Sequence, residues 1–178
     1  MNITKLQREK IDKKIIYIDM DNVLVDFPSA FEHFDSDILK EYKNKEDEIP
    51  TIFGKMKPLP NAIEAYNLLD KYFQVYILST SPWDNPTALP DKLSWIRTHL
   101  PSAFKNVIFS HNKHLNLGDY LIDDRDKNGA AEFTGEHIYF KHESGPKNWQ
   151  ETIDYIFEKE GISDGLQLQP EKHLNSIK

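Results

Sequence analysis

Four aspartates stand where two apolar segments of the chain end. Asp19 and Asp21 follow the first segment, and Asp123 and Asp124 follow the second. Side chains two residues apart on an extended chain face the same side, and open α/β sheets bind ligands beyond the carboxyl ends of their strands. If the two segments are neighbouring strands, the four carboxylates converge on one place.

Converging carboxylates repel one another and lose hydration, so a cation is needed to offset their charge. Oxygen ligands without cysteine or a histidine cluster suit Mg²⁺, which keeps several waters and accepts phosphate oxygens. The chain has no cysteine, which excludes disulfides, thiolate zinc sites, iron–sulfur clusters and cysteine nucleophiles. Either pair alone would more often be a helix cap or a turn, but the two together predict a Mg²⁺ site that takes a phosphate.

Hydroxyl and ammonium groups follow two other apolar segments. Thr80 and Ser81 come after one, where hydroxyls and free backbone N–H groups can hold phosphate oxygens, and Lys113 comes after the next. Taken alone, Thr80 and Ser81 would be ordinary turn residues, and Lys113 would be a solvated surface charge. His111 and His114 have the spacing of a metal pair but lack a third ligand, so solvated loop histidines are favoured there.

Five short runs of β-branched and aromatic residues predict the strands that position these groups. The runs are continuous rather than alternating, which is typical of strands buried on both faces of a parallel sheet. The predicted strands are residues 15–18, 75–78, 107–109, 120–122 and 138–140. With helices between them, the chain predicts a three-layer α/β fold around a central, mainly parallel sheet.

Three gaps between these runs carry a residue that can cap a helix, followed by an apolar stripe at helical spacing. The predicted caps are Asn61 with Glu64, Asp91 after Pro90, and Asn148 with Glu151. Pro101 and Gly161 mark where the second and third helices should end.

One segment, residues 28–60, is far too long for an ordinary loop between a strand and its crossover helix. Its middle is highly charged, and its aromatic and aliphatic residues supply a modest apolar face. We expect it to form a small helical cap inserted after the first strand. The predicted core domain is then 1–27 with 61–165, and 166–178 form a polar tail.

The composition fits one globular domain with a small insertion. The chain has 178 residues, with 29 acidic against 22 basic side chains and a net charge of −7. An acidic chain is unsuited to general binding of nucleic acid polymers, which needs a basic face. No apolar run reaches the roughly 18 residues of a membrane span, and the first residues are polar. We expect a cytoplasmic protein that works without a membrane, with no indication of an oligomer.

The order of these motifs resembles the haloacid dehalogenase superfamily, which has Asp-x-Asp after the first strand, Ser or Thr after the second, Lys after the third and an Asp pair after the fourth. The resemblance covers nearly the whole chain and implies a Rossmann-like fold. Within the superfamily the chain is most similar to the 5′(3′)-deoxyribonucleotidases. The matching segments are Asp19-Met20-Asp21-Asn22-Val23-Leu24-Val25-Asp26-Phe27, Thr80-Ser81-Pro82, the spacing of Lys113 and Asp123, Ile122-Asp123-Asp124-Arg125, and Asn148-Trp149.

The resemblance implies a phosphomonoesterase that acts on deoxynucleoside monophosphates. Asp19 would be the nucleophile that forms an aspartyl-phosphate, and Asp21 the general acid and base; both roles suit carboxylates so placed. Mg²⁺ would bind Asp19, the main-chain carbonyl of Asp21, and a carboxylate of Asp124 or Asp123, with Asp124 favoured.

The remaining expected site residues surround the phosphate or the nucleoside. Those implied by the resemblance near the phosphate are Thr80, Ser81, Lys113, Lys92 and Arg125, and Phe27 would lie beside the nucleotide. Phe53 and Trp83 are further candidates for apolar cover over the base or deoxyribose, although packing is the more ordinary role of such residues. Lys92 could equally be a plain surface charge.

Two departures and three alternatives accompany this interpretation. Asn22 replaces the small residue often found after the second aspartate, and the segment 28–60 is shorter than the cap of animal nucleotidases. The same chemistry on another small phosphate, such as a sugar phosphate, is one alternative. A non-enzymatic scaffold that binds metal, phosphate or a partner is another, although every chemical position is filled. A receiver domain is the third, but its motifs occur in a different order.

Overall fold

The structure is a computed structural model, in which residues 13–163 are described. Five parallel strands form its main sheet in the order β5-β4-β1-β6-β7. The strands are β1 (Ile15–Ile18), β4 (Gln74–Ser79), β5 (Val107–Phe109), β6 (Tyr120–Asp123) and β7 (Glu136–Tyr139). All five were predicted, the last about two residues too late. Because β5, β4, β1 and β6 are consecutive in this order, the four strand ends that carry the motifs are neighbours.

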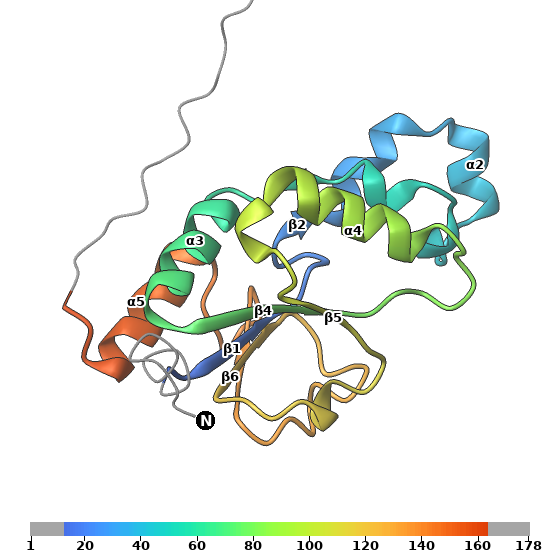
Figure 1. Ribbon diagram of the computed structural model, residues 1–178. Coiled ribbons are helices and arrows are strands. Elements are labelled where there is room, and N and C mark those ends of the chain that lie inside the picture. The colour runs from blue at the N-terminus through green and yellow to red at the C-terminus, as the bar shows by residue number, and fades with distance from the viewer. Residues whose placement is uncertain (1–12, 164–178) are drawn as a thin grey trace, which may run out of the picture.

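Three helices pack against one face of this sheet: α3 (Ala62–Tyr72), α4 (Ala88–His99) and α5 (Trp149–Glu160). Figure 1 shows them along one side of the strands, while the chain that follows β5 and β6 runs along the other. That second face is covered by a smaller apolar cluster, which includes Tyr17, Leu121 and Phe133. The predicted three-layer α/β class is confirmed, with loops and the 3₁₀ helix η5 (Lys113–Leu115) covering the second face.

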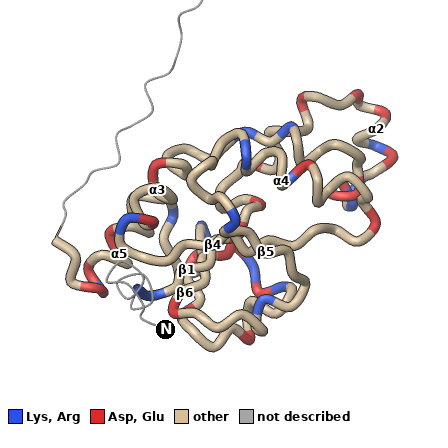
Figure 2. Tube along the Cα trace, in the orientation of Figure 1, with Lys and Arg blue, Asp and Glu red and all other residues tan. Residues whose placement is uncertain are grey.

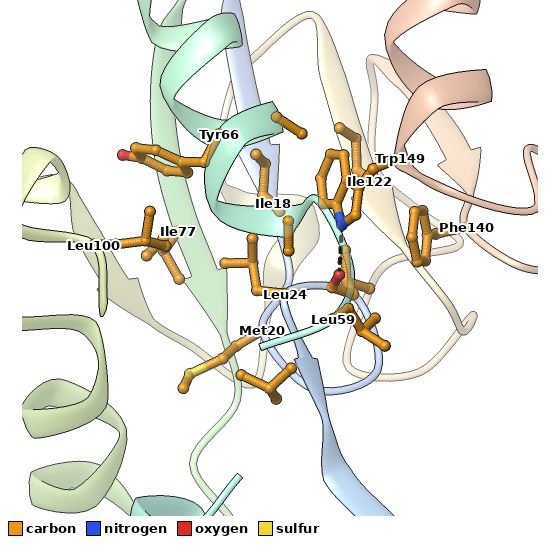
Figure 3. Close-up of a cluster of buried hydrophobic side chains, with 14 of the residues drawn as sticks. Ile18, Met20, Leu24, Leu59, Tyr66, Ile77, Leu100, Ile122, Phe140 and Trp149 are labelled. Carbon is orange, nitrogen blue, oxygen red and sulfur yellow. Dashed lines mark hydrogen bonds between the residues drawn. The ribbon is translucent and has the colours of Figure 1, made fainter. Parts of the chain in front are cut away.

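The main core also fixes the turn that follows β1. Figure 3 shows the Trp149 ring beside Phe140 and directed at the backbone near Leu24. The indole Nε1–H of Trp149 donates a hydrogen bond to the carbonyl of Val23, 2.9 Å away. Ile18, Leu24 and Trp149 are fully or almost fully buried, so packing holds this turn rigidly.

Two of the three predicted helix starts differ from the structure. Asn61 precedes α3 but has a φ of 61° and makes no capping hydrogen bond, so the predicted capping box with Glu64 is wrong. A left-handed turn there replaces the extended conformation that a capping residue needs. α4 begins at Ala88, after Thr87 rather than at Asp91, because Pro90 fits within a first helical turn and does not have to precede it.

The third helix starts and ends as predicted. The side chain of Asn148 accepts a hydrogen bond from the backbone N–H of Glu151, 2.9 Å away, and Gly161 ends the helix with a φ of 65°. α4 ends at His99, just before Pro101, also as expected.

The segment 28–60 folds as a set of short elements between two paired strands. Val25–Asp26 (β2) and Lys57–Pro58 (β3) pair antiparallel. Between them lie η1 (Phe27–His33), α2 (Ser36–Glu41), η2 (Glu46–Glu48) and η3 (Ile52–Gly54). We call residues 28–60 the cap.

The predicted tail, 166–178, lies outside the described residues, as do the first 12 residues of the predicted core domain. Among the residues that the structure describes, no helix is both long and apolar enough to cross a membrane. Acidic side chains are prominent around α2 in the cap (Figure 2).

Candidate active site

A tight turn presents the first aspartate pair. The backbone N–H of Asp19 donates to the carbonyl of Ile122 at 2.9 Å, which continues the pairing of β1 with β6. The carbonyl of Met20 then accepts hydrogen bonds from the backbone N–H groups of 23–25, at 2.9 to 3.3 Å. Asn22, at the tip, has a φ of 58°. Asparagine tolerates this left-handed conformation better than most residues, which explains its place in the motif.

Lys113 lies between two carboxylates. Its ammonium is 2.9 Å from Asp19 Oδ1 and also donates to Asp123 Oδ2. All three side chains are buried, with at most 3% of their surface exposed. Burial alone would lower the pKa of Lys113, but the charges of Asp19 and Asp123 outweigh it and raise the pKa. Lys113 is therefore held as a cation next to Asp19.

The second aspartate pair divides its contacts unequally. Both oxygens of Asp123 have partners, because Oδ1 accepts from the backbone N–H of Arg125 at 3.0 Å and Oδ2 accepts from Lys113. Asp124 Oδ1 is buried without a hydrogen bond, and the Arg125 guanidinium Nε is 3.4 Å from it. A buried carboxylate oxygen without a hydrogen bond is costly, which leaves Asp124 suited to a cation.

Asp19, Asp123 and Asp124 offer oxygen atoms that all lie within 4.8 Å of one another. Within residues 13–163, this is the one set of three acidic, histidine or cysteine side chains so placed. Three carboxylates with no sulfur or nitrogen ligand suit a hard cation such as Mg²⁺. The donor set and the buried Asp124 oxygen that accepts no hydrogen bond therefore both fit a magnesium ion.

Lys92 forms a second buried ion pair, with Asp21. Its ammonium is 2.7 Å from Asp21 Oδ2 and donates to Ser79 Oγ at 3.0 Å and to the Thr80 carbonyl at 2.6 Å. The Lys92 side chain is fully buried, and its ammonium lies 4.5 Å from the centre of the Phe53 ring. Lys92 is thus no surface charge, and it connects the turn after β1, the end of β4 and the cap.

The carboxylates are held in an environment that disfavours their charge. Burial, followed by repulsion from Asp19, raises the pKa of Asp123 to about 7. Burial also raises the pKa of Asp21 and of Asp124, against the opposing attraction of neighbouring cations. A bound divalent cation would relieve this excess of negative charge.

The predicted hydroxyls follow β4. Thr80 Oγ1 donates to the carbonyl of Ser110 at 3.1 Å, which ties the end of β4 to the loop after β5. Ser81 is half-buried and lines a hollow of about 290 Å³ together with Trp83 and His111. Both residues therefore lie at the same sheet edge as the aspartates.

The aromatic candidates differ in their exposure. Phe27 is half-buried, with its ring centre 5.6 Å from those of Phe31 and Phe53. Phe53 is fully buried and packs beneath Lys92, so it is a packing residue of the cap. Trp83 is 88% exposed and stands edge-on to His111.

Sequence reasoning missed two buried polar residues that hold the site together. Ser79 accepts a hydrogen bond from Lys92; in the sequence it is one of three consecutive hydroxyl residues, and nothing there distinguishes it as a partner of Lys92. Asn85 donates to the carbonyls of Asp47 and Ile49 at 2.8 and 2.9 Å, and accepts from Thr87. An asparagine before proline is typical of a turn, and nothing in the sequence indicates that it binds the cap.

Comparison with protein families identifies close relatives. Residues 37–159 match the family model of the 5′ nucleotidase, deoxy (pyrimidine), cytosolic type C proteins. A protein of Vibrio phage KVP40, whose name assigns it provisionally to the 5′(3′)-deoxyribonucleotidases, is 48% identical over 163 residues, covering 88% of this chain and 95% of its own. The 5′(3′)-deoxyribonucleotidase of Bacillus subtilis strain 168 is 28% identical over 148 residues, covering 72% and 85%.

Solved structures agree at the level of the fold. A subfamily IA hydrolase of the haloacid dehalogenase superfamily from Geobacter sulfurreducens superposes with a TM-score of 0.56 at 15% identity, over 80% of this chain and 99% of that one. A magnesium-bound hydrolase of the same superfamily from Bacillus subtilis gives a TM-score of 0.51 at 13% identity, over 76% and 90%. The chain therefore has the fold of the haloacid dehalogenase-like hydrolases. It belongs to the 5′(3′)-deoxyribonucleotidase family and is a phosphoric monoester hydrolase of the 5′-nucleotidase type.

Proposed function

We propose that this protein is a Mg²⁺-dependent phosphatase that dephosphorylates deoxynucleoside monophosphates through a phosphorylated Asp19. The observation that supports this most strongly is the arrangement of Asp19, buried beside the Lys113 ammonium and within reach of Asp123 and Asp124. A carboxylate, a cation and a pair of carboxylates that could hold a metal are thereby gathered at one edge of the sheet. The names of the relatives support the deoxynucleotide as the substrate class.

In the first step, an Asp19 oxygen attacks phosphorus while the bond from phosphorus to the nucleoside oxygen breaks. Asp21 gives its proton to the leaving alkoxide, so the products are the nucleoside and an aspartyl-phosphate. Burial raises the pKa of Asp21 against the attraction of Lys92, so this carboxyl group takes up a proton more readily than a solvated aspartate. Lys92, 2.7 Å from Asp21 Oδ2, orients that carboxyl group.

In the second step, water attacks phosphorus, gives a proton to Asp21 and releases inorganic phosphate from Asp19. Lys113 neutralises Asp19 and the phosphate in both steps, and Thr80 and Ser81 bind phosphate oxygens through hydroxyl and backbone groups. Mg²⁺, held by Asp19, the Asp21 carbonyl and Asp124, would supply Lewis-acid stabilisation of the phosphoryl oxygens.

The nucleoside is proposed to lie between the cap and the core. Phe27 is half-buried where the chain enters the cap, so it can present an apolar face to the sugar or base. Arg125, half-exposed beside Asp124, supplies a further cation at the mouth. Residues 28–60 would thus act as the substrate-covering cap.

The test is phosphate release from a panel of deoxyribo- and ribonucleoside monophosphates and sugar phosphates, with Mg²⁺ or with EDTA. We expect Mg²⁺-dependent release that favours deoxynucleotides and that Asp19→Asn abolishes. Asp26→Asn, in β2 directly after the turn that carries Asp21 and outside the proposed machinery, is the matched control and should retain activity. Equal or faster turnover of sugar phosphates would overturn the substrate class, and full activity of Asp19→Asn would overturn the mechanism.

A further inference from the structure

The residue before α4 binds the cap through its hydroxyl group. A threonine in this place ordinarily accepts a hydrogen bond from the backbone of the first helical turn, but the Thr87 side chain makes no such bond. Its hydroxyl instead donates to Asn85 Oδ1 at 3.0 Å and accepts from the backbone N–H of Thr51 in the cap at 2.7 Å. Thr87 therefore holds the cap rather than capping its own helix.

The cap residue that Thr87 contacts has a strained backbone. Thr51 has a φ of 69°, in the left-handed region that β-branched residues rarely adopt. Such a conformation persists only where its surroundings determine it. The hydrogen bond to Thr87 is one such constraint, because a freed Thr51 would relax toward a right-handed or extended backbone. The position of η3, which begins at the next residue, thus depends on Thr87.

η3 places an aromatic ring against the buried lysine of the site. Phe53 lies in η3 and is fully buried, with its ring centre 4.5 Å from the Lys92 ammonium. The face of an aromatic ring attracts a cation at this distance. Lys92 itself belongs to α4, and η3 packs against this helix (Figure 1). The cap therefore supports the ammonium that α4 carries.

Lys92 in turn determines how Asp21 is presented. Its ammonium is 2.7 Å from Asp21 Oδ2, whereas Asp21 Oδ1 is buried and makes no hydrogen bond within the described part of the chain. Oδ1 is thus the oxygen left to face the leaving group. A general acid works only within hydrogen-bond reach of the atom it protonates, and a misplacement of about 1 Å can slow a reaction about a hundredfold.

We propose that Thr87 is a positioning residue for this reaction. It holds η3 in place, so that Phe53 and Lys92 keep Asp21 aimed at the leaving oxygen. The inference rests on the proposed function, in which Asp21 is the proton donor. Loss of the Thr87 hydroxyl should therefore slow a reaction whose leaving group needs a proton and spare one whose leaving group does not.

Two substrates with different leaving groups test this on the full chain in Mg²⁺. A nucleoside alkoxide must be protonated as it leaves, whereas p-nitrophenyl phosphate releases a stable phenolate without a proton. The nucleotide is whichever common deoxynucleoside 5′-monophosphate the wild type hydrolyses fastest. We expect Thr87→Val to lower kcat/KM at least about tenfold for the nucleotide and less than about twofold for p-nitrophenyl phosphate. Thr87→Ser keeps the hydroxyl and should match the wild type on both substrates.

Two further variants control for changes in folding. Thr98→Val makes the same change at an exposed position of α4, where the hydroxyl donates to the carbonyl of Ser94 one turn earlier; both rates should stay unchanged. Phe53→Leu disturbs the support of Lys92 from the cap and should reproduce the selective loss, whether or not Thr87→Val folds. Circular dichroism melts establish which variants are folded.

The outcomes distinguish this inference from the proposed function. Equal slowing of both substrates by folded Thr87→Val or Phe53→Leu, or no slowing, would overturn the positioning role and leave the proposed function standing. A selective loss that Thr87→Ser shares would also overturn it, because the hydroxyl would then not be responsible. A wild type that hydrolyses no deoxynucleoside monophosphate would overturn the proposed function, and the positioning role with it.

Discussion

Lys92 is the cation on which the charge of Asp21 depends. It is fully buried and its ammonium contacts Asp21, Ser79 and Thr80. Removing one member of a buried ion pair leaves the other uncompensated and typically costs about 3–5 kcal/mol. Lys92→Met keeps the length of the side chain and loses its charge, so we expect it to lower the free energy of unfolding by about 3 kcal/mol.

Urea denaturation measures this effect. Lys71→Met replaces an exposed lysine on α3 and should stay within about 0.5 kcal/mol of the wild type. If Lys92→Met is as stable as Lys71→Met, the ion pair with Asp21 does not stabilise the fold and the structural role given to Lys92 is wrong.

Asp124 is the aspartate expected to respond to metal. Its Oδ1 is buried without a hydrogen bond, whereas both oxygens of Asp123 have protein partners. Mg²⁺ at about 100 times its dissociation constant should raise the melting temperature of the wild type by about 5–10 °C. We expect Asp124→Asn to abolish that increase. Without metal, Asp124→Asn should melt no lower than the wild type, because the substitution removes repulsion among the site carboxylates.

Differential scanning calorimetry with Mg²⁺ and with EDTA provides the measurement. The control is Asp126→Asn, which alters a neighbouring aspartate whose side chain is 61% exposed and should keep the shift. A full Mg²⁺ shift in Asp124→Asn would contradict the assignment of this residue as a ligand.

At the scale of elements, Asn85 joins the cap to the start of α4. Its amide satisfies the carbonyls of Asp47 and Ile49, and the cap is further held by the Trp95 indole N–H, which donates to Met56 at 2.8 Å. Asn85→Ala leaves two carbonyls without this donor, so we expect a loss of about 1–3 kcal/mol and faster tryptic cleavage at Lys43.

Asn67→Ala is the matched control, because Asn67 is exposed on α3 and alanine favours helices. Its digestion rate should equal that of the wild type. If Asn85→Ala is digested no faster than Asn67→Ala, the cap does not depend on this contact.

The elements that the sequence predicted best are those governed by local pattern. Continuous apolar runs located all five strands, and Asn148 with Glu151 located the start of α5. The start of α3 could not be predicted in the same way, because Asn61 adopts a left-handed conformation set by the preceding turn.

The contacts of the site were only partly predictable for a related reason. Strand order brings the two aspartate pairs together, and their residue types indicate the chemistry. The burial of Lys92 depends on how α4 packs against η3, and the cap contacts of Asn85 join residues 36 and 38 positions apart. Such long-range packing leaves no periodic signal.

At the scale of the whole molecule, stability should depend on pH through buried histidine. Burial lowers the pKa of His137 below 6.5, although Asp126 opposes the effect. The side chain is 8% exposed and stacks on Tyr139 with ring centres 3.9 Å apart. Well above pH 6.5, His137 is neutral in both the folded and the unfolded chain. As the pH falls, the unfolded chain binds the proton first, so stability is lost.

His137→Gln should therefore flatten the decline in stability between about pH 6.5 and pH 5. Comparing the variant with the wild type at each pH cancels the opposite contribution of the site aspartates. Urea midpoints across this range provide the measurement, with His33→Gln, at an exposed position in the cap, as the control. An unchanged pH dependence in His137→Gln would show that the pKa of His137 is the same in the folded and the unfolded chain, which contradicts the prediction.

The most direct test of the central proposal is to trap the phosphorylated protein. The wild type and Asp19→Asn are mixed with a deoxynucleoside monophosphate carrying a radiolabelled phosphate, in Mg²⁺, and quenched in acid within a single turnover. We predict a hydroxylamine-sensitive label on the wild type that peptide mapping assigns to Asp19, and none on Asp19→Asn. Label on Asp19→Asn, or full phosphate release by a wild type that never carries label, would contradict the proposal.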